Sequence, residues 1–159
     1  MVVYRLSKQK YKEDLSGTGA SYGVNNRWNT KGTKLLDTSS SRALVCSEVS
    51  VHIPLGLLPI DGDYHMVCIE IPNHINVLEP SLQQLPSTWN SRPVSPESQE
   101  FGDDFVLKSE FAVLKVPSIV VSGDYNFLIN PKHPDASMIT LRYTESFPFD
   151  PRLLGAKER

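Results

Sequence analysis

The stretch NNRWNTKGTK, residues 25–34, places an arginine and a large aromatic residue side by side among turn-forming neighbours. Asn and Gly favour loop conformations, so the segment is predicted to be a loop. Two interpretations are open. Either Trp28 folds back onto the core from an ordinary surface loop, or Arg27 belongs to a binding loop and is aimed at an anionic ligand, because a guanidinium group donates paired hydrogen bonds to phosphate oxygens.

The best-known catalytic and nucleotide-binding motifs are absent from the sequence. It contains neither GxxxxGK[ST] nor GxGxxG after a predicted strand, which excludes the usual phosphate-binding loops. Its four histidines have no HxxH or HExxH spacing, so no metal site is predicted. A GxSxG motif and an evident Cys–His nucleophile pair are also missing. An enzyme built on this chain therefore works without these signatures.

The chain is predicted to contain several short strands in mixed order with short helices. β-Branched and aromatic residues predict strands at 2–6, 33–38, 64–71 and 75–79, at 110–121 with a break at Pro117, and late in the chain within 137–150. This order favours an α+β domain over a regular βαβ alternation.

Three short helices are predicted between these strands. The first spans 7–17, with Ser7 as cap and Gly17 as stop. The second spans 39–53, is capped by Ser39 or Ser40 and ends at Pro54. The third begins near Pro96, although Gly102 weakens it. The remaining connections, at 17–32, 85–98 and 125–136, are predicted to be loops or turn-rich.

The overall composition is that of an ordinary globular protein. The 159 residues suit one domain, with 40% hydrophobic and 21% charged residues. A net charge of −2 excludes a global basic field that would attract nucleic acid or membrane. No apolar run is long enough to span a membrane, and the first residues lack signal-peptide features. Cys46 and Cys68 are expected to be buried free thiols, which fits a cytoplasmic protein.

Several stretches, in order along the chain, resemble the RES-domain family, which is named for an arginine, a glutamate and a serine. They are YRL (4–6), LSGTGASYGVNNRWNTKGT (15–33), RALVCSEV (42–49), SPESQEFGDDFVLKSEFAVLKVPS (95–118), NFLINPKHPD (126–135) and FPFDPRLL (147–154). The match runs along nearly the whole chain. Residues 1–159 are therefore interpreted as one RES-like, NAD-binding toxin domain.

The resemblance implies a fold, an activity and a partner. RES proteins are typically toxins of bacterial type II toxin–antitoxin systems, and they have an ADP-ribosyltransferase-like shape with central sheets and short flanking helices. They consume NAD⁺ as substrate, by hydrolysis, with phosphate as acceptor, or by transferring ADP-ribose to a protein. The usual partner is a helix-turn-helix antitoxin of the Xre type, whose tail covers the active site. Contact with DNA is then expected through the antitoxin alone.

The family's functional residues carry over to particular positions. Arg5 and Arg27 match its two arginines, Glu48 its glutamate and Ser98 its serine. Other serines lie close to Ser98 in the sequence, namely Ser95, Ser109 and Ser118. Each position also has a structural interpretation: Arg5 pairs with a carboxylate such as Glu13, Glu48 lies on a solvated helix face, and the Ser98 hydroxyl caps a helix.

Cleavage of NAD⁺ fits these residue types. The forked guanidinium groups of Arg5 and Arg27 suit a pyrophosphate. The nicotinamide–ribose bond breaks through an oxocarbenium-like state, and its leaving group departs neutral, so one carboxylate is enough where ordinary glycosidases use two. Glu48 would stabilise the positive charge, or act as base for an acceptor. Ser98 would bind a ribose hydroxyl or the nicotinamide end, and Trp28 would pack under the loop or against a ring.

Asp37 departs from the family pattern, since a tyrosine is common at this position. An aspartate cannot stack on a flat ring, and beside Glu48 it would repel the second carboxylate, so that one pKa would rise. Another aromatic residue then replaces the tyrosine, the reaction is tuned differently, or activity is weak. Asp37→Tyr is predicted to raise turnover. Two alternatives to NAD⁺ depletion stay open: ADP-ribosylation of a protein, and a degenerate module that only binds its antitoxin.

Overall fold

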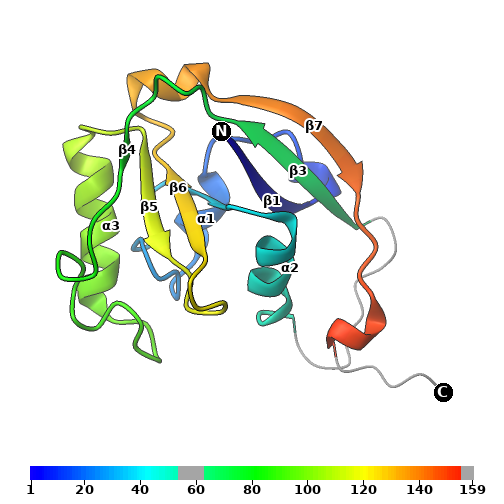
Figure 1. The fold of residues 1–159 in the computed structure, drawn as a ribbon, viewed down its shortest axis with the longest axis horizontal. Coiled ribbons are helices and arrows are strands. Elements are labelled where there is room, and N and C mark those ends of the chain that lie inside the picture. The colour runs from blue at the N-terminus through cyan, green and yellow to red at the C-terminus, as the bar shows by residue number, and fades with distance from the viewer. Residues whose placement is uncertain (54–62, 155–159) are drawn as a thin grey trace.

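A seven-stranded sheet forms the centre of the protein (Figure 1). The structure is a computed structural model that describes residues 1–53 and 63–154. The strands are β1 (Val2–Lys8), β2 (Leu36–Ser39), β3 (Tyr64–Glu70), β4 (Val77–Leu78), β5 (Val113–Pro117), β6 (Tyr125–Ile129) and β7 (Thr140–Ser146). They lie in the order β4-β5-β6-β2-β1-β3-β7, and every pair is antiparallel except β4 with β5.

The sheet has two parts that meet at one short contact. On one side β1 pairs with β3 along its full length, and on the other β2 pairs with β6 from Leu36↔Ile129 to Ser39↔Asn126. Between β1 and β2 the register contains only Tyr4↔Ser39. Figure 1 shows β5 and β6 running in a different direction from β1, β3 and β7. Side chains at this joint can therefore face residues from both parts.

The two longer helices begin at serine caps. Helix α2 (Arg42–Ser50) begins after Ser41, whose hydroxyl accepts a hydrogen bond from the Leu44 N–H at 3.1 Å. Helix α3 (Pro96–Lys108) begins after Ser95, whose hydroxyl accepts from the Ser98 N–H at 3.2 Å. Such caps satisfy N–H groups that have no partner within the helix. Both starts are thus encoded locally.

Helices α2 and α3 cover the same face of the sheet. A cluster under α3 combines Phe105 and Val106 with Leu114 of β5 and Leu128 of β6. A second cluster packs Val45 of α2 against strand residues of β1 and β3, namely Leu6 and Met66. The largest cluster, which includes Val3, Leu36, Val113 and Ile129, lies on the opposite face. Because strand side chains alternate between faces, Asp37, Ser39 and Asn126 lie on the face that the two helices cover.

Several predictions for the elements are confirmed. The fold class is α+β, in one compact domain with one sheet and short helices. The strands at 2–6 and 64–71 and the helix near Pro96 are all present. The second helix lies within the predicted 39–53, but it is capped by Ser41 and ends at Ser50; Pro54 lies outside the described residues.

Other predictions are wrong. Residues 7–17 do not form a helix, because Ser7 and Lys8 continue β1 in register with β3 and leave only a 3-10 turn, η1 (Gln9–Tyr11). The predicted loop at 17–32 contains the short helix α1 (Thr18–Tyr22). The turn-rich connection at 125–136 contains strand β6 and the 3-10 helix η2 (Pro134–Met138), and no strand follows Pro117 directly. A last 3-10 turn, η3 (Pro151–Leu154), ends the described chain.

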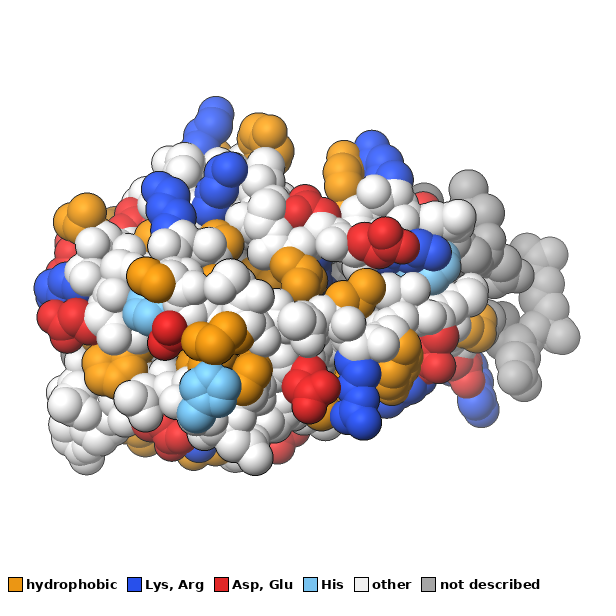
Figure 2. All heavy atoms as spheres, turned by 90° about the horizontal axis from the view of Figure 1, so that it is seen from above, with side chains coloured by type: hydrophobic (Ala, Val, Ile, Leu, Met, Phe, Trp, Pro, Cys, Tyr) orange, Lys and Arg blue, Asp and Glu red, His pale blue; other side chains and the backbone are white. Residues whose placement is uncertain are grey.

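The surface carries both signs of charge. Figure 2 shows basic and acidic side chains interspersed with hydrophobic ones over the face in view. Cys46 is half-buried and Cys68 is buried, and both are free thiols. Within residues 1–53 and 63–154, no helix is long and apolar enough to cross a membrane.

Candidate functional site

The Arg27 loop is fixed against helix α3. Gly102 lies so close to it that an added Cβ would be 1.7 Å from the Trp28 carbonyl oxygen. One turn away, the Gln99 amide donates to the Asn26 carbonyl at 2.9 Å. The Asp103 carboxylate accepts from the backbone N–H of Thr30 at 3.0 Å and from its hydroxyl at 2.5 Å. These contacts come from one side of α3, since residues three and four apart share a helix face.

Trp28 belongs to the core beneath this loop. Only 6% of its surface is exposed, and it packs in the cluster under α3. Its ring meets Phe101 edge to face, with centroids 6.1 Å apart. The structure thus places Trp28 under the loop, the first of the two positions expected for it, and this anchor sets the direction of the preceding arginine.

The Arg27 side chain reaches from its loop to the long connection before α3. Its Nη1 donates to the carbonyl oxygens of Trp89 at 2.6 Å and of Ser91 at 3.1 Å. Desolvation lowers the pKa of this half-buried guanidinium, nearby Arg92 lowers it further, and Glu48 acts in the opposite direction. Arg27 therefore lies within the electrostatic reach of Glu48, as expected for two parts of one site.

Glu48 is held by two neutral donors. Its Oε1 accepts from the Ser118 hydroxyl at 2.7 Å and from the Asn126 amide at 2.6 Å. The amide oxygen of Asn126 in turn accepts from the Ser39 hydroxyl at 2.7 Å. Within the described part of the chain, Oε2 of Glu48 has no hydrogen-bond partner. The carboxylate is thus oriented through one oxygen while the other remains available to a ligand.

Asp37 lies in the same electrostatic environment. Its side chain is exposed to solvent, yet desolvation raises the pKa of the carboxyl group to about 6. We attribute this combination to water reaching the carboxyl group from one side while protein surrounds the others. Arg5 opposes the rise and Glu48 adds to it. The pKa of Asp37 thus changes in the direction that was expected for a carboxylate near Glu48, but desolvation contributes more to the rise than the charge of Glu48 does.

Arg5 interacts electrostatically with Asp37. Its neighbours Tyr4 and Leu6 pack with α2, so alternation directs Arg5 to the other face of β1. There its Nη1 donates to the Asp14 carbonyl oxygen at 2.6 Å. Burial lowers the pKa of the guanidinium, and the charges of Asp14 and Asp37 raise it. Arg5 and Asp37 interact across the joint at which β1 and β2 share a single residue pair.

The two candidate serines have different surroundings. Ser98 is fully buried at the start of α3, and its hydroxyl is 2.9 Å from the Ser95 hydroxyl. Ser118 follows β5, binds Glu48, and accepts hydrogen bonds from the N–H groups of Val120 and Val121, both at 3.0 Å. The structure therefore brings Ser118 to Glu48 and places Ser98 in the packing of a helix.

Sequence analysis did not single out Asn126 or Arg92. Asn126 lies in a stretch whose sequence predicts a turn-rich connection, and such a prediction gives no side-chain alternation that would direct Asn126 to a face of the sheet. Ser118 belongs to the VPS motif that ends the 95–118 match, but this stretch contains four serines, and the sequence alone does not distinguish which of them has the family's role. Arg92 lies in a proline-rich segment without periodicity, so the sequence does not indicate where its side chain points.

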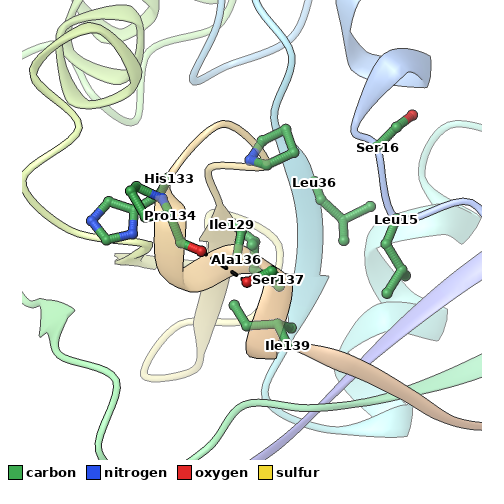
Figure 3. Close-up of a pocket in the computed structure, with 10 residues that line it drawn as sticks. Leu15, Ser16, Leu36, Ile129, His133, Pro134, Ala136, Ser137 and Ile139 are labelled. Atoms are coloured by element: carbon green, nitrogen blue, oxygen red, sulfur yellow. Dashed lines mark hydrogen bonds between the residues drawn. The ribbon is translucent and has the colours of Figure 1, made fainter.

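A separate groove of about 260 Å³ contains none of the predicted site residues (Figure 3). Leu36, Ile129, Ile139 and Leu15 supply much of its lining, and His133 contributes an imidazole. It offers no pair of opposite charges. The group around Glu48 combines opposite charges and is therefore the candidate site. Among the described residues, no three His, Cys, Asp or Glu side chains gather as a potential metal site.

The fold matches that of a solved toxin–antitoxin component. The crystal structure of the M. tuberculosis MbcT–MbcA toxin–antitoxin complex contains a chain that aligns with a TM-score of 0.71 and 16% sequence identity. The alignment covers 97% of this chain and 86% of that one. At this identity the similarity establishes the class of fold, in agreement with the predicted ADP-ribosyltransferase-like shape.

The chain belongs to the RES-domain family, whose family model, described as RES domain, matches residues 2–150. It is 38% identical over 146 residues to the Prs ADP-ribosylating toxin of Sphingobium sp. (strain YBL2), covering 89% of this chain and 88% of that protein. It is 35% identical over 162 residues to Toxin Res of Photorhabdus laumondii, covering 99% and 100%. The predicted resemblance is thereby confirmed.

Proposed function

We propose that this protein cleaves the nicotinamide–ribose bond of NAD⁺ and acts as the toxin of a toxin–antitoxin pair. The observation that carries the proposal is Glu48, oriented through Oε1 by Ser118 and Asn126, with Oε2 directed to no partner among the described residues. The names of the relatives support it, since they are toxins and one is an ADP-ribosylating toxin.

Glu48 supplies the negative charge that this reaction needs. As the C–N bond breaks, its electron pair goes to the nicotinamide nitrogen, and positive charge develops on the ribose. A carboxylate beside the ribose stabilises this charge, and because both fixed donors are neutral, its negative charge is not cancelled by a bonded cation. Attack by water gives ADP-ribose, nicotinamide and one proton, which Glu48 can accept; attack by phosphate gives ADP-ribose phosphate and nicotinamide.

In this proposal Arg27 and Arg5 bind the pyrophosphate from opposite faces of the sheet, at the joint where β1 and β2 share a single residue pair. Arg27 has its guanidinium fixed by two backbone carbonyls, which is an arrangement that pre-organises the remaining N–H groups. Arg5 is fixed similarly at one N–H by Asp14. Asp37 acts on Arg5 by its charge, and because neutral pH lies above its raised pKa of about 6, its carboxylate is mostly ionised there and competes with a phosphate for that guanidinium.

We assign the serine role in this mechanism to Ser118 rather than to Ser98. Ser118 acts on the carboxylate, whose position it fixes with Asn126. Ser98 would have to leave its contact with Ser95 inside the protein to reach a ligand. This assignment changes the residue predicted from the sequence and keeps the chemistry.

A second candidate function shares the first step. The Sphingobium relative is an ADP-ribosylating toxin, and the present chain is 38% identical to it. In this alternative, a protein side chain takes the place of water or phosphate as acceptor. In either case the partner is an antitoxin, for which we propose the Xre type that covers the active site, and NAD⁺ is the substrate.

The decisive experiment measures nicotinamide release and NAD⁺ loss by the purified protein, with and without phosphate. We expect release that disappears in Glu48→Gln, and phosphate dependence would identify the acceptor. Release that requires an added bacterial protein fraction, with radiolabel from NAD⁺ on a protein band, would identify the transferase. A folded protein that releases nicotinamide under none of these conditions would contradict both activities and leave a module that binds its antitoxin.

A further inference from the structure

Arg92 lies where the connection before α3 approaches both Arg27 and Glu48. Its Nη2 is 3.4 Å from the carbonyl oxygen of Ile119, the residue after Ser118. On the other side, the carbonyl of Ser91, immediately before Arg92, accepts a hydrogen bond from Arg27. Arg92 thus contacts the backbone next to Ser118 directly, and its neighbour Ser91 connects the same segment to the side chain of Arg27.

The charge of Arg92 acts on Arg27, and neither guanidinium has an acidic partner among the described residues. Among the described residues, no carboxylate lies within ion-pair distance of Arg27 or Arg92. Among the other described arginines, Arg42 contacts Glu145 and Arg152 contacts Asp150, whereas Arg5 and Arg142 have no carboxylate within ion-pair distance. The charges of Arg27 and Arg92 therefore remain uncompensated by a carboxylate at short range.

The contacts of Arg27 leave donors for a ligand. Both of its hydrogen bonds to carbonyls involve Nη1, so Nη2 and Nε have no acceptor among the described residues. Arg92 is exposed and uses only Nη2 in a long hydrogen bond. Guanidinium donors in such pairs match the oxygens of a phosphate group, and the anion removes the repulsion between the two cations.

We propose that Arg92 and Arg27 together form a binding site for one phosphate group beside Glu48. The proposal rests on the NAD⁺-cleaving function for its biological meaning, but binding itself can be measured without turnover. The phosphate can come from two sources: the pyrophosphate of NAD⁺, or inorganic phosphate that acts as the acceptor. The chemistry of recognition is the same for both.

Isothermal titration calorimetry of ADP-ribose and of inorganic phosphate tests the site in the full chain. The variants are Arg92→Gln, which removes the charge, and Arg92→Lys, which keeps the charge and removes the fork. Arg142→Gln is the matched control, because Arg142 is an exposed arginine on β7, at the opposite end of the sheet from β5. Thermal unfolding verifies that each variant is folded.

We expect Arg92→Gln to weaken binding of one of these probes by about tenfold, Arg92→Lys by less, and Arg142→Gln not at all. Weaker ADP-ribose binding assigns the site to the pyrophosphate. Unchanged ADP-ribose binding with weaker phosphate binding, and a higher phosphate concentration for half-maximal nicotinamide release, assigns it to the acceptor.

The proposal is overturned if Arg92→Gln binds both probes as tightly as the wild type. Its failure is separate from failure of the proposed function. If Arg92→Gln leaves both nicotinamide release and the binding of the probes unchanged, NAD⁺ cleavage is supported and the phosphate site is contradicted. If ADP-ribose binding depends on Arg92 but the protein releases no nicotinamide, the phosphate site is supported and NAD⁺ cleavage is contradicted.

Discussion

Helices α2 and α3 cover one face of the same sheet but contribute to the site in different ways. α3 buries Ser98, Gly102, Phe105 and Val106 and holds the Arg27 loop by direct contacts. The buried residues of α2 are Leu44 and Val45, and this helix presents Glu48 to hydrogen-bond donors from β5 and β6.

This difference suggests that α3 mainly positions the Arg27 loop, while α2 carries the carboxylate proposed to act in the reaction. Changes on the inner side of α3 should act mainly on stability and on the placement of Arg27, since they disturb close packing. Changes around Glu48 should act mainly on turnover, since they disturb one carboxylate at the edge of a small cluster. Four experiments, in order of decreasing expected effect, test this difference between the two helices.

The largest effect is expected from Glu48→Gln. Glutamine keeps the oxygen that accepts from Ser118 and Asn126 but carries no charge, so nicotinamide release should fall by about 10²- to 10³-fold while the free energy of unfolding changes by less than about 1 kcal/mol. Glu100→Gln, on the exposed side of α3, is the control for removal of a carboxylate. A loss of unfolding free energy in Glu48→Gln that is large enough to explain its loss of nicotinamide release would contradict the proposed difference between the two helices.

Gly102→Ala should produce the opposite pattern. Its Cβ would meet the Trp28 carbonyl oxygen at 1.7 Å, and because that atom belongs to the backbone, the loop or the helix must shift. We expect a loss of about 3 kcal/mol in urea unfolding and weaker NAD⁺ binding. Gly19→Ala is the control: it has nothing within 4 Å and should stabilise α1 slightly, by about 0.5–1 kcal/mol. A fully stable Gly102→Ala would contradict the close fit of loop and helix.

The two serines give a direct comparison within the same framework. Ser118→Ala removes a hydrogen bond to a charged group, so activity should fall by about tenfold. Ser98→Ala removes the buried contact between α3 and its cap Ser95, so it should cost about 1 kcal/mol of stability and leave activity within about twofold. Steady-state kinetics and urea unfolding of both variants provide the test. The reverse result would restore Ser98 as the functional serine of this chain.

The smallest effect concerns Asp37 and pH. Its folded-state pKa of about 6 exceeds the usual 3.8, so the folded state binds the proton more tightly than the unfolded one. The contribution of Asp37 to stability is therefore complete below about pH 4 and is lost as the pH rises through about 6. Because the side chain is exposed, solvent screening reduces the effect to about 1 kcal/mol. Urea unfolding between pH 4 and 7 should show this loss in the wild type and not in Asp37→Asn; parallel profiles would contradict the raised pKa.

The sequence was informative where a pattern is local. The β-branched run at 2–6 and the proline at the start of α3 predicted their elements, and the loop chemistry around Arg27 predicted an irregular segment that positions an arginine. The prediction of a helix at 7–17 is wrong although Lys, Gln and Glu are good helix formers, because the pairing of Ser7 and Lys8 with β3 overrides this local preference.

The surroundings of Glu48 could not be predicted in the same way. Ser118 and Asn126 reach it from 70 and 78 residues along the chain, and no local pattern encodes such a meeting. The family resemblance predicted a role for this carboxylate, but the identity of its donors depends on the register between β2 and β6, in which Ser39 and Asn126 are partners. Only the assembled sheet specifies that network.

The contacts between α3 and the Arg27 loop have a consequence for hydrogen exchange. The segment from Asn26 to Thr30 has no regular secondary structure, yet the Thr30 N–H is bonded to Asp103, and the Asn26 carbonyl is bonded to Gln99. Its amide protons should therefore exchange through the same opening event that exposes α3, and not through independent opening of a loop. In this protein, the segment that carries Arg27 is irregular in conformation but cooperative with a helix in its unfolding.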